Sequence, residues 1–282
     1  MAALINDLPP GHLVSDRVRW LALLSWLFIM LPLLFSGRAE ADNWSTTEAH
    51  FQYGQLEAPS FVGNKTESTR ILTLQHASSW RYGDNFFFVD YLDDSGSDGF
   101  NDQDFYAEWY SNFSLGKISG RRFGLGPVRD IGLLLGINLA ADADVRKYLP
   151  GLRLSWNLPG FAFLNTDLTA YIDDSQGAVR GGAPTEDNSF MLDVNWALPF
   201  DWAGHSFSIQ GHIEYIGERN NEFGAEVNDW LLAQPQFRWD AGKAWFGVAD
   251  QLFLGIEYQW WYHKLGGESS ESAVQALAVW RF

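Results

Sequence analysis

The chain has 282 residues, of which 46% are hydrophobic and 16% aromatic, with 35 acidic and 19 basic side chains and no cysteine. A formal net charge of -16 argues against binding to nucleic acid phosphates, and the lack of cysteine excludes disulfide scaffolds, zinc ribbons and thiol enzymes. A mean hydropathy of -0.16 also excludes a polytopic helical membrane protein, which would need several apolar runs of about 20 residues.

The N-terminal region contains the one long apolar run of the sequence, residues 20–35. Arg17 and Arg19 precede this run, and the small-residue step Ala39-Glu40-Ala41 follows it. A basic flank, an apolar stretch and an A-x-A step are together typical of a secretory signal peptide. We therefore predict that residues 1–41 are an export signal.

An uncleaved anchor helix is the alternative for this run, but the run is slightly short for a full span and Pro32 interrupts it near its end. In the preferred interpretation, cleavage occurs before about Asp42 and residues 42–282 form the mature protein. The exported part then carries all of the net negative charge, because residues 1–41 contain three basic and three acidic side chains.

Alternation of apolar and polar residues with a period of two recurs through the mature chain, whereas no long stretch has a helical period. Between Ser206 and Tyr215, for example, apolar side chains occupy the odd positions except at Gly211, and polar side chains occupy the even positions. The alternation predicts strands near residues 45–55, 69–82, 85–93, 104–115, 129–140, 149–158, 164–173, 189–198, 206–217, 229–240, 251–264 and 272–282. About twelve strands, an even number, favour an all-β fold: a transmembrane antiparallel up-and-down β-barrel.

The linkers between these strands alternate in length. With a periplasmic N-terminus of the mature chain, the linkers expected outside the cell are polar, glycine-rich and mostly long; they cover residues 55–68, 93–102, 141–149, 174–188, 218–228 and 265–271. The periplasmic linkers include tight turns at residues 82–85 and 158–161, although residues 118–127 and 241–250 form longer ones. Long outer loops and short inner turns are typical of outer-membrane barrels.

The last strand supports the same interpretation. Val274, Ala276, Ala278, Trp280 and Phe282 lie on one face of this strand, and a terminal strand of this form resembles the assembly signal of bacterial outer-membrane barrels. A soluble sandwich or a lipocalin-like barrel is the alternative, but the many Trp, Tyr and Phe residues would overfill its interior. A lipid-facing surface accepts them easily, so we expect the protein in the Gram-negative outer membrane.

If the apolar face meets lipid, the opposite face lines a pore, and solute contacts must come from that face. By alternation the wider set on this face includes Glu48, His50, Gln52, Asn157, Asp167, Asp173, Asn195, Gln210, Gln236, Gln259, His263 and Arg281. The candidate solute-binding residues are Phe88, Asp90, Tyr106, Glu108, Tyr110, Arg153, Tyr171, Asp193, His212, Glu214, Arg238, Glu257 and Trp261. The alternative for any one of them is a structural role, in which interior charges pair and hold a narrow barrel open or plug it.

No catalytic site is expected. The sequence has no G-x-S-x-G motif, and His205 and Ser206, as neighbours on a strand, point to opposite faces. The pairs Glu48-x-His50 and His212-x-Glu214 could share a metal ion only if their strands met, and such spacing arises freely from alternation. The acidic segment 93–102 lacks the terminal Glu of an EF-hand. We therefore predict neither a metal site nor a cofactor.

Residues 76–90, with the sequence HASSWRYGDNFFFVD, closely resemble a strand-turn-strand signature of the nucleoside-specific channel-forming outer-membrane porins, the Tsx-like family. This resemblance implies a monomeric twelve-stranded barrel with a narrow channel, through which nucleosides pass by diffusion over weak aromatic and polar sites. Only the signature residues are matched. The nucleoside contacts of the family are not carried over to individual positions of this sequence.

The combined hypothesis is a passive outer-membrane channel for small hydrophilic solutes, with nucleosides as the favoured class. Acidic residues outnumber basic ones on the lumen face, so anion selectivity is not expected, and aromatic and amide groups suit a neutral polar solute. The expected partners are the lipid bilayer and its lipopolysaccharide, the assembly machinery through Phe282, and the solutes. The alternatives are a structural or phage-docking barrel with a plugged lumen and, with no catalytic cluster to support it, a lipid-modifying enzyme.

Overall fold

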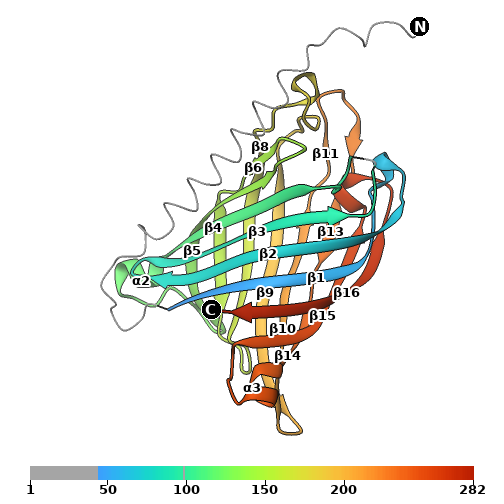
Figure 1. Ribbon diagram of the computed structural model, residues 1–282. Coiled ribbons are helices and arrows are strands. Elements are labelled where there is room, and N and C mark those ends of the chain that lie inside the picture. Colours follow the sequence, from blue (N-terminus) through green and yellow to red (C-terminus); the bar gives the residue numbers. More distant parts are fainter. Residues whose placement is uncertain (1–43, 98) are drawn as a thin grey trace, which may run out of the picture. The chain divides into compact units, whose positions relative to one another are not determined.

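The computed structural model describes residues 44–97 and 99–282, which form one closed antiparallel β-barrel (Figure 1). The expected signal peptide, residues 1–41, and its cleavage site before Asp42 lie outside the described residues. Among the described residues, no helix is long and apolar enough to cross a membrane.

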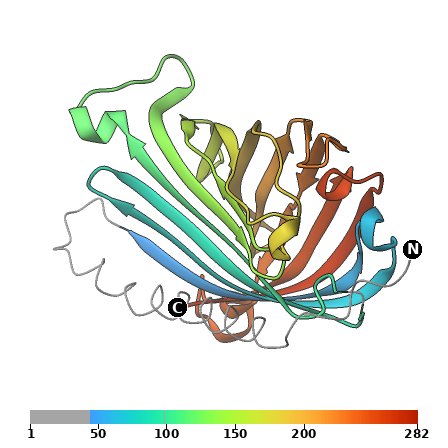
Figure 2. The same ribbon diagram turned by 90° about the horizontal axis from the view of Figure 1, so that it is seen from above.

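The strands follow one another round the wall in chain order. Their bounds are β1 Ser45–Glu57, β2 Thr66–Trp80, β3 Gly83–Asp94, β4 Asp104–Ser114, β5 Val128–Ala140, β6 Val145–Tyr148, β7 Gly151–Trp156, β8 Phe163–Asp173, β9 Ser189–Trp202, β10 His205–Ile216, β13 Trp230–Ala233, β14 Gln236–Asp240, β15 Leu252–Tyr262 and β16 Glu271–Arg281. Consecutive strands pair, except that β6 and β7 both pair with β5 and β8, and β13 and β14 both pair with β10 and β15. β16 pairs with β1, with Arg281 opposite Glu48, which closes the ring. Figure 2 shows the strands curving round a common interior.

The barrel has twelve strand positions because two of them hold a broken strand. β6 and β7 are separated by Leu149 and Pro150, and β13 and β14 by Gln234 and Pro235. Proline has no N–H to donate to a ladder, so each strand is interrupted where it meets one. The carbonyl oxygens of both prolines still accept ladder bonds, from Ala170 N at 2.9 Å and from Tyr258 N at 2.9 Å.

The alternation sorts side chains to the two faces as predicted. In β4, Trp109 is 52% exposed on the outer face, whereas Tyr110 is 9% exposed inside. Exposed outer side chains such as Leu152, Leu168 and Leu192 pair with one another across β7, β8 and β9. An apolar band on the outside and a polar interior are the two faces that a membrane barrel requires.

The linkers also differ at the two ends. We call the end at which β1 begins and β16 ends the terminal end, and the opposite end the loop end. At the loop end the linkers carry three short 3-10 helices, η1 Ser60–Val62, η2 Ala178–Arg180 and η3 Lys264–Gly266, and a small hairpin of β11 Arg219–Asn220 and β12 Glu226–Val227. At the terminal end two linkers contain short helices, α2 Leu115–Ser119 and α3 Ala241–Phe246.

Two predicted boundaries were wrong. The outer linker expected at residues 141–149 is only residues 141–144, because β6 begins at Val145. The turn expected at residues 82–85 lies at Arg81 and Tyr82, and Gly83 already belongs to β3. A side chain at Gly83 would come within 1.7 Å of the carbonyl oxygen of Asn112, so this glycine allows two strands to approach rather than forming the turn.

Candidate functional site: the barrel lumen

The interior holds a cavity of about 1820 Å³ that is lined from one end of the barrel to the other. Thr46 and Ser114 line it near the terminal end, and Phe61 and Gly267 line it at the loop end. The thirteen candidate residues all contribute to its wall: Phe88, Asp90, Tyr106, Glu108, Tyr110, Arg153, Tyr171, Asp193, His212, Glu214, Arg238, Glu257 and Trp261. Of the wider set, Asn157, Asp173 and His263 do not line it, because they lie at strand ends.

Two of the candidate residues form buried ion pairs with the barrel wall. Arg153 donates to Asp167 from Nε and Nη2, at 2.7 and 2.6 Å, and its Nη1 reaches Asp84 on the far side of two strands at 3.0 Å. Arg238 is 2% exposed and donates from Nη1 to Glu48 at 2.9 Å. These contacts favour the structural alternative for both arginines, because a buried charge needs such partners.

The Glu48 carboxylate also excludes the suggested metal site. It receives Arg238 on Oε2 and Arg281 on Oε1, at 2.9 and 2.7 Å, and His50 Nε2 lies 2.9 Å from Oε2. Glu48 and His50 are on β1 and His212 and Glu214 on β10, so the two pairs do not share a site. Within residues 44–97 and 99–282, no group of three or more metal-binding side chains is close enough to hold an ion.

Four carboxylates in the middle of the lumen are held differently. Among the described residues, Asp90, Glu108, Glu214 and Glu257 form no ion pair with lysine or arginine. Glu108 accepts hydrogen bonds from the Tyr106 hydroxyl at 2.5 Å and from Asn138 Nδ2 at 2.9 Å. These neutral donors hold its carboxylate in place without cancelling its charge.

Glu257 and Asp90 follow the same pattern. Glu257 accepts from the amides of Gln52, Gln236 and Gln275 at 2.7, 2.6 and 3.0 Å, and Asp90 accepts from the Thr73 hydroxyl at 2.6 Å. Glu108 on β4 and Glu214 on β10 act on each other electrostatically across the lumen. Within the described part of the chain, the middle of the channel thus contains four carboxyl groups that have no lysine or arginine partner.

Two further candidate residues, Asp193 and His212, belong to a chain of polar contacts along the wall. His212 bonds to Asp193 through Nδ1 at 2.9 Å and to Gln234 Oε1 through Nε2 at 3.0 Å. Gln234 donates to Gln259 at 3.0 Å, and Gln259 donates to Glu271 at 2.9 Å. Since carboxylates only accept and each amide presents one acceptor, both nitrogens of His212 face acceptors, which is the arrangement of a protonated imidazole.

An aromatic and apolar belt covers the loop half of the lumen on one side. Its buried members pack in one cluster: Tyr110, Leu134, Leu149, Tyr171, Met191, Ile216, Trp230, Leu232 and Trp261. The rings of Tyr171 and Trp230 meet edge to face, with centroids 6.2 Å apart. Phe88 on β3 and Tyr106 on β4 also line the lumen, with ring centroids 6.0 Å apart. Flat faces and indole groups therefore border the acidic centre.

The sequence analysis missed Trp230 and Leu232, which line the lumen. Both occupy even-numbered positions, as do the predicted lumen residues Gln236 and Arg238 on the same broken strand. The alternation along the strand would have placed both on the lumen face, but their apolar side chains favoured the lipid face. The same reasoning explains Met191 on β9, which is 2% exposed and faces inward.

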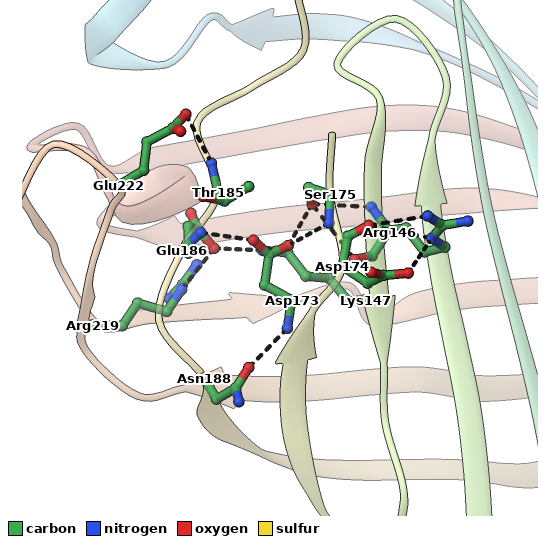
Figure 3. A network of polar contacts seen from close by, with 10 residues as sticks. All are labelled: Arg146, Lys147, Asp173, Asp174, Ser175, Thr185, Glu186, Asn188, Arg219 and Glu222. Carbon is green, nitrogen blue, oxygen red and sulfur yellow. Dashed lines mark hydrogen bonds and ion pairs between the residues drawn. The ribbon is translucent and has the colours of Figure 1, made fainter. Parts of the chain in front are cut away.

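The linker of residues 174–188 folds across the loop end of the lumen and is held by buried ion pairs (Figure 3). Lys147 contacts Asp173 at 3.0 Å and Glu186 at 2.6 Å, and Arg219 Nε donates to Glu186 at 2.8 Å. The Arg219 guanidinium also lies 4.2 Å from the centroid of the Trp230 ring. Gly181, Gly182, Ala183 and Pro184 thereby join the lining at the loop end.

A second anchor at the loop end is Lys264 in η3, which contacts the carboxylate of Glu271 and donates to the carbonyl oxygen of Glu57 at 2.5 Å. Burial lowers the pKa of Lys264, although Glu271 beside it acts in the opposite direction. Lys264 ties η3 to the strands on both sides of the β16–β1 closure.

No protein-family model matches the chain, and no curated protein matches it in sequence. Solved structures do resemble it. The KdgM porin is 8% identical, with 83% of this chain and 99% of that chain covered and a TM-score of 0.45. The NanC porin is 12% identical, with 82% and 98% covered and a TM-score of 0.48. An outer-membrane channel from Pseudomonas putida F1 is 11% identical, with 88% and 98% covered and a TM-score of 0.46.

Proposed function

We propose that the protein is a passive outer-membrane channel for small hydrophilic solutes. The observation that carries this proposal is the cavity of about 1820 Å³, whose wall includes residues from both ends of the barrel. A polar wall inside and an apolar band outside are the arrangement of a water-filled pore in lipid. The mechanism is equilibrium partitioning of the solute into the lumen, followed by release down its gradient.

Nucleosides are the favoured solutes. The four carboxylates without ion pairs, Asp90, Glu108, Glu214 and Glu257, disfavour anions, whereas a neutral nucleoside meets hydrogen-bond acceptors and aromatic faces. Residues 76–90, which resemble the nucleoside-specific family, form the end of β2, its turn and the first part of β3. Within this segment Phe88 and Asp90 face the lumen beside Tyr106.

The same proposal places the terminal end on the periplasmic side, with the long linkers outside. Phe282 is 77% exposed, and its N–H donates to the carbonyl oxygen of Thr47 at 3.0 Å, so the last residue is presented at the barrel rim. This position suits recognition by the assembly machinery. The proposal also includes a monomeric state in phospholipid and lipopolysaccharide, which the closed ring of strands supports by offering no strand edge among the described residues to pair with another copy.

Single-channel conductance in planar bilayers tests the function. Purified protein is expected to give steps of current that decrease when a nucleoside is added, because a bound solute obstructs the ions. Current steps that do not change with added nucleoside would contradict nucleoside binding but leave a general channel intact. Complete absence of current would contradict the channel itself.

A plugged attachment barrel is the second candidate, and the fold of residues 174–188 over the loop end favours it. The two candidates differ in one measurement. If the protein is a channel narrowed by this linker, deletion of residues 176–185 should widen the channel and give larger current steps. If it is an attachment barrel, the same deletion removes its surface loop and should not produce larger current steps. No catalytic activity is proposed.

A further inference from the structure

The outer surface at the terminal end carries a continuous group of aromatic rings that extends beyond the strands. We call it the aromatic platform; its residues are Phe200, Trp202, His205, Phe207, Phe237, Trp239, Trp245 and Phe246. The rings form a connected series. Phe207 stacks on Phe200 and Phe237, with centroids 5.5 and 5.4 Å apart, and Trp239 meets Trp245 edge to face at 5.2 Å. The platform therefore joins the outward face of β9, β10 and β14 to the helix α3.

More than half of the surface of three of these rings is exposed. Trp202 is 72%, Trp245 57% and Phe246 69% exposed. Trp202 ends β9 at the turn, and Trp245 and Phe246 end α3, which lies beyond the ends of β14 and β15 (Figure 1). An exposed apolar patch of this kind marks a surface that contacts something other than water.

The helix that presents Trp245 and Phe246 is fixed to the barrel rather than loosely attached. Asp240, which is 3% exposed, accepts hydrogen bonds from Lys243 N at 2.8 Å and from Asp250 N at 2.9 Å. At its other end Gly247 adopts φ 70°, a left-handed conformation that suits glycine and ends the helix. Since both ends are held, the exposed rings have a fixed direction relative to the strands.

The charge around the platform indicates what it contacts. The linker of residues 241–251 contains two charged side chains. Lys243 in α3 donates from its ammonium to the Ser206 hydroxyl at 2.6 Å and lies 4.0 Å from Asp201, and Asp250, outside α3, lies 3.8 Å from the Arg281 guanidinium. In the other long linker of this end, residues 115–127, Lys117, Arg121 and Arg122 stand among the apolar residues. The linker with α3 therefore has the composition of a segment that enters the apolar side of a bilayer interface.

We propose that the aromatic platform lies in the interfacial layer of the lipid bilayer, with α3 along the membrane surface and Trp245 and Phe246 inserted in it. The inference rests on the proposed membrane placement of the barrel. Three features support lipid as the occupant. The platform continues the lipid-facing band of β9, β10 and β14, and tryptophan prefers the membrane interface. The only charged side chain on α3, Lys243, contacts the polar side chains of Ser206 and Asp201. The patch would anchor the barrel at one depth and one side of its circumference.

The test uses the absence of cysteine from the native chain. Single variants Phe246→Cys, Leu168→Cys and Val179→Cys receive a nitroxide label, and the full-length protein is reconstituted in vesicles of phosphatidylethanolamine and phosphatidylglycerol. Leu168 is 53% exposed on the outward face of β8 and serves as the lipid control; Val179 is 93% exposed in η2 and serves as the water control. Relaxation of each label by oxygen, which enters lipid, is compared with relaxation by a water-soluble nickel complex.

We expect the label at position 246 to resemble the label at position 168, with oxygen the more effective relaxant. If the label at position 246 responds to nickel as strongly as the label at position 179, the proposal is overturned. If the label at position 168 is at the same time relaxed mainly by oxygen, the membrane placement of the barrel still holds. A water response at position 168 as well would instead contradict the membrane placement. Protection from both relaxants, or dipolar broadening between labels, would identify a protein partner or a second copy and would also overturn the proposal.

Discussion

The guanidinium of Arg153 holds the carboxylate of Asp167 through two parallel hydrogen bonds, from Nε to Oδ1 at 2.7 Å and from Nη2 to Oδ2 at 2.6 Å. Its third contact, to Asp84, joins residues 69 positions apart in the sequence. Arg153 thus links β7 to β8 and both to β3 through the interior. The geometry is the bidentate one that makes arginine and carboxylate pairs strong.

Substitution of Arg153 by methionine is expected to lower the free energy of unfolding by about 3–5 kcal/mol, because it leaves buried carboxylates without a cation. Guanidinium unfolding in detergent micelles measures the change. Arg146→Met is the matched control, since the Arg146 and Asp174 side chains are 39% and 54% exposed and their pair contributes about 0–1 kcal/mol. Equal losses in the two variants would show that the Arg153 pairs have no special structural role.

Substitution of Glu108 by glutamine is expected to make the channel less selective for cations. The amide oxygen can still accept from Tyr106 and Asn138, so the wall is preserved while one of the four carboxyl groups without a lysine or arginine partner is replaced by a neutral amide. The reversal potential in a salt gradient measures the effect and should move toward zero. Asp93→Asn, at an exposed pair with Arg70 in the loop region, is the control and should leave the potential unchanged.

Substitution of Gly136 by alanine is expected to displace the ring of Tyr110. A methyl group at position 136 would lie 2.5 Å from Cε1 of Tyr110 and 3.2 Å from Cβ of Leu149. Overpacking of this kind costs about 1–3 kcal/mol, so stability should decrease, and we expect the displaced ring to enter the lumen and lower the conductance as well. The double variant Gly136→Ala, Tyr110→Ala should recover the conductance. If it does not, displacement of the ring is not the cause.

Substitution of Glu222 by alanine is expected to loosen the linker of residues 174–188. Glu222 Oε1 accepts from Ala178 N at 2.8 Å and from Thr185 N at 3.3 Å, and these bonds hold both arms of the linker. Figure 3 shows the bond to Thr185. Hydrogen exchange of residues 176–186 should become faster, and the current through single channels should become noisier. Glu218→Ala is the control. Unchanged exchange in the Glu222 variant would indicate that Lys147 and Arg219 alone hold the linker.

The sequence determined which side chains face the lumen because that property is local. In a strand the side chains alternate between the two faces, so Glu108 and Trp109 must point to opposite sides wherever the strand lies in the barrel. The same alternation placed the thirteen candidate residues on the cavity wall. The prediction missed Trp230, Leu232 and Met191 because they are apolar and were therefore expected on the lipid face. Their positions in the alternation place them on the lumen face.

Only the tertiary structure decided which of the lumen residues neutralise one another. The partners of Arg153 and of Arg238 come from strands far apart in sequence, and their meeting depends on the stagger at which the sheet closes. Among the residues that the structure describes, it also leaves Asp90, Glu108, Glu214 and Glu257 without a lysine or arginine partner and folds residues 174–188 over the loop end. Alternation along one strand contains no information about strands on the other side of the lumen, which is why these features required the closed barrel.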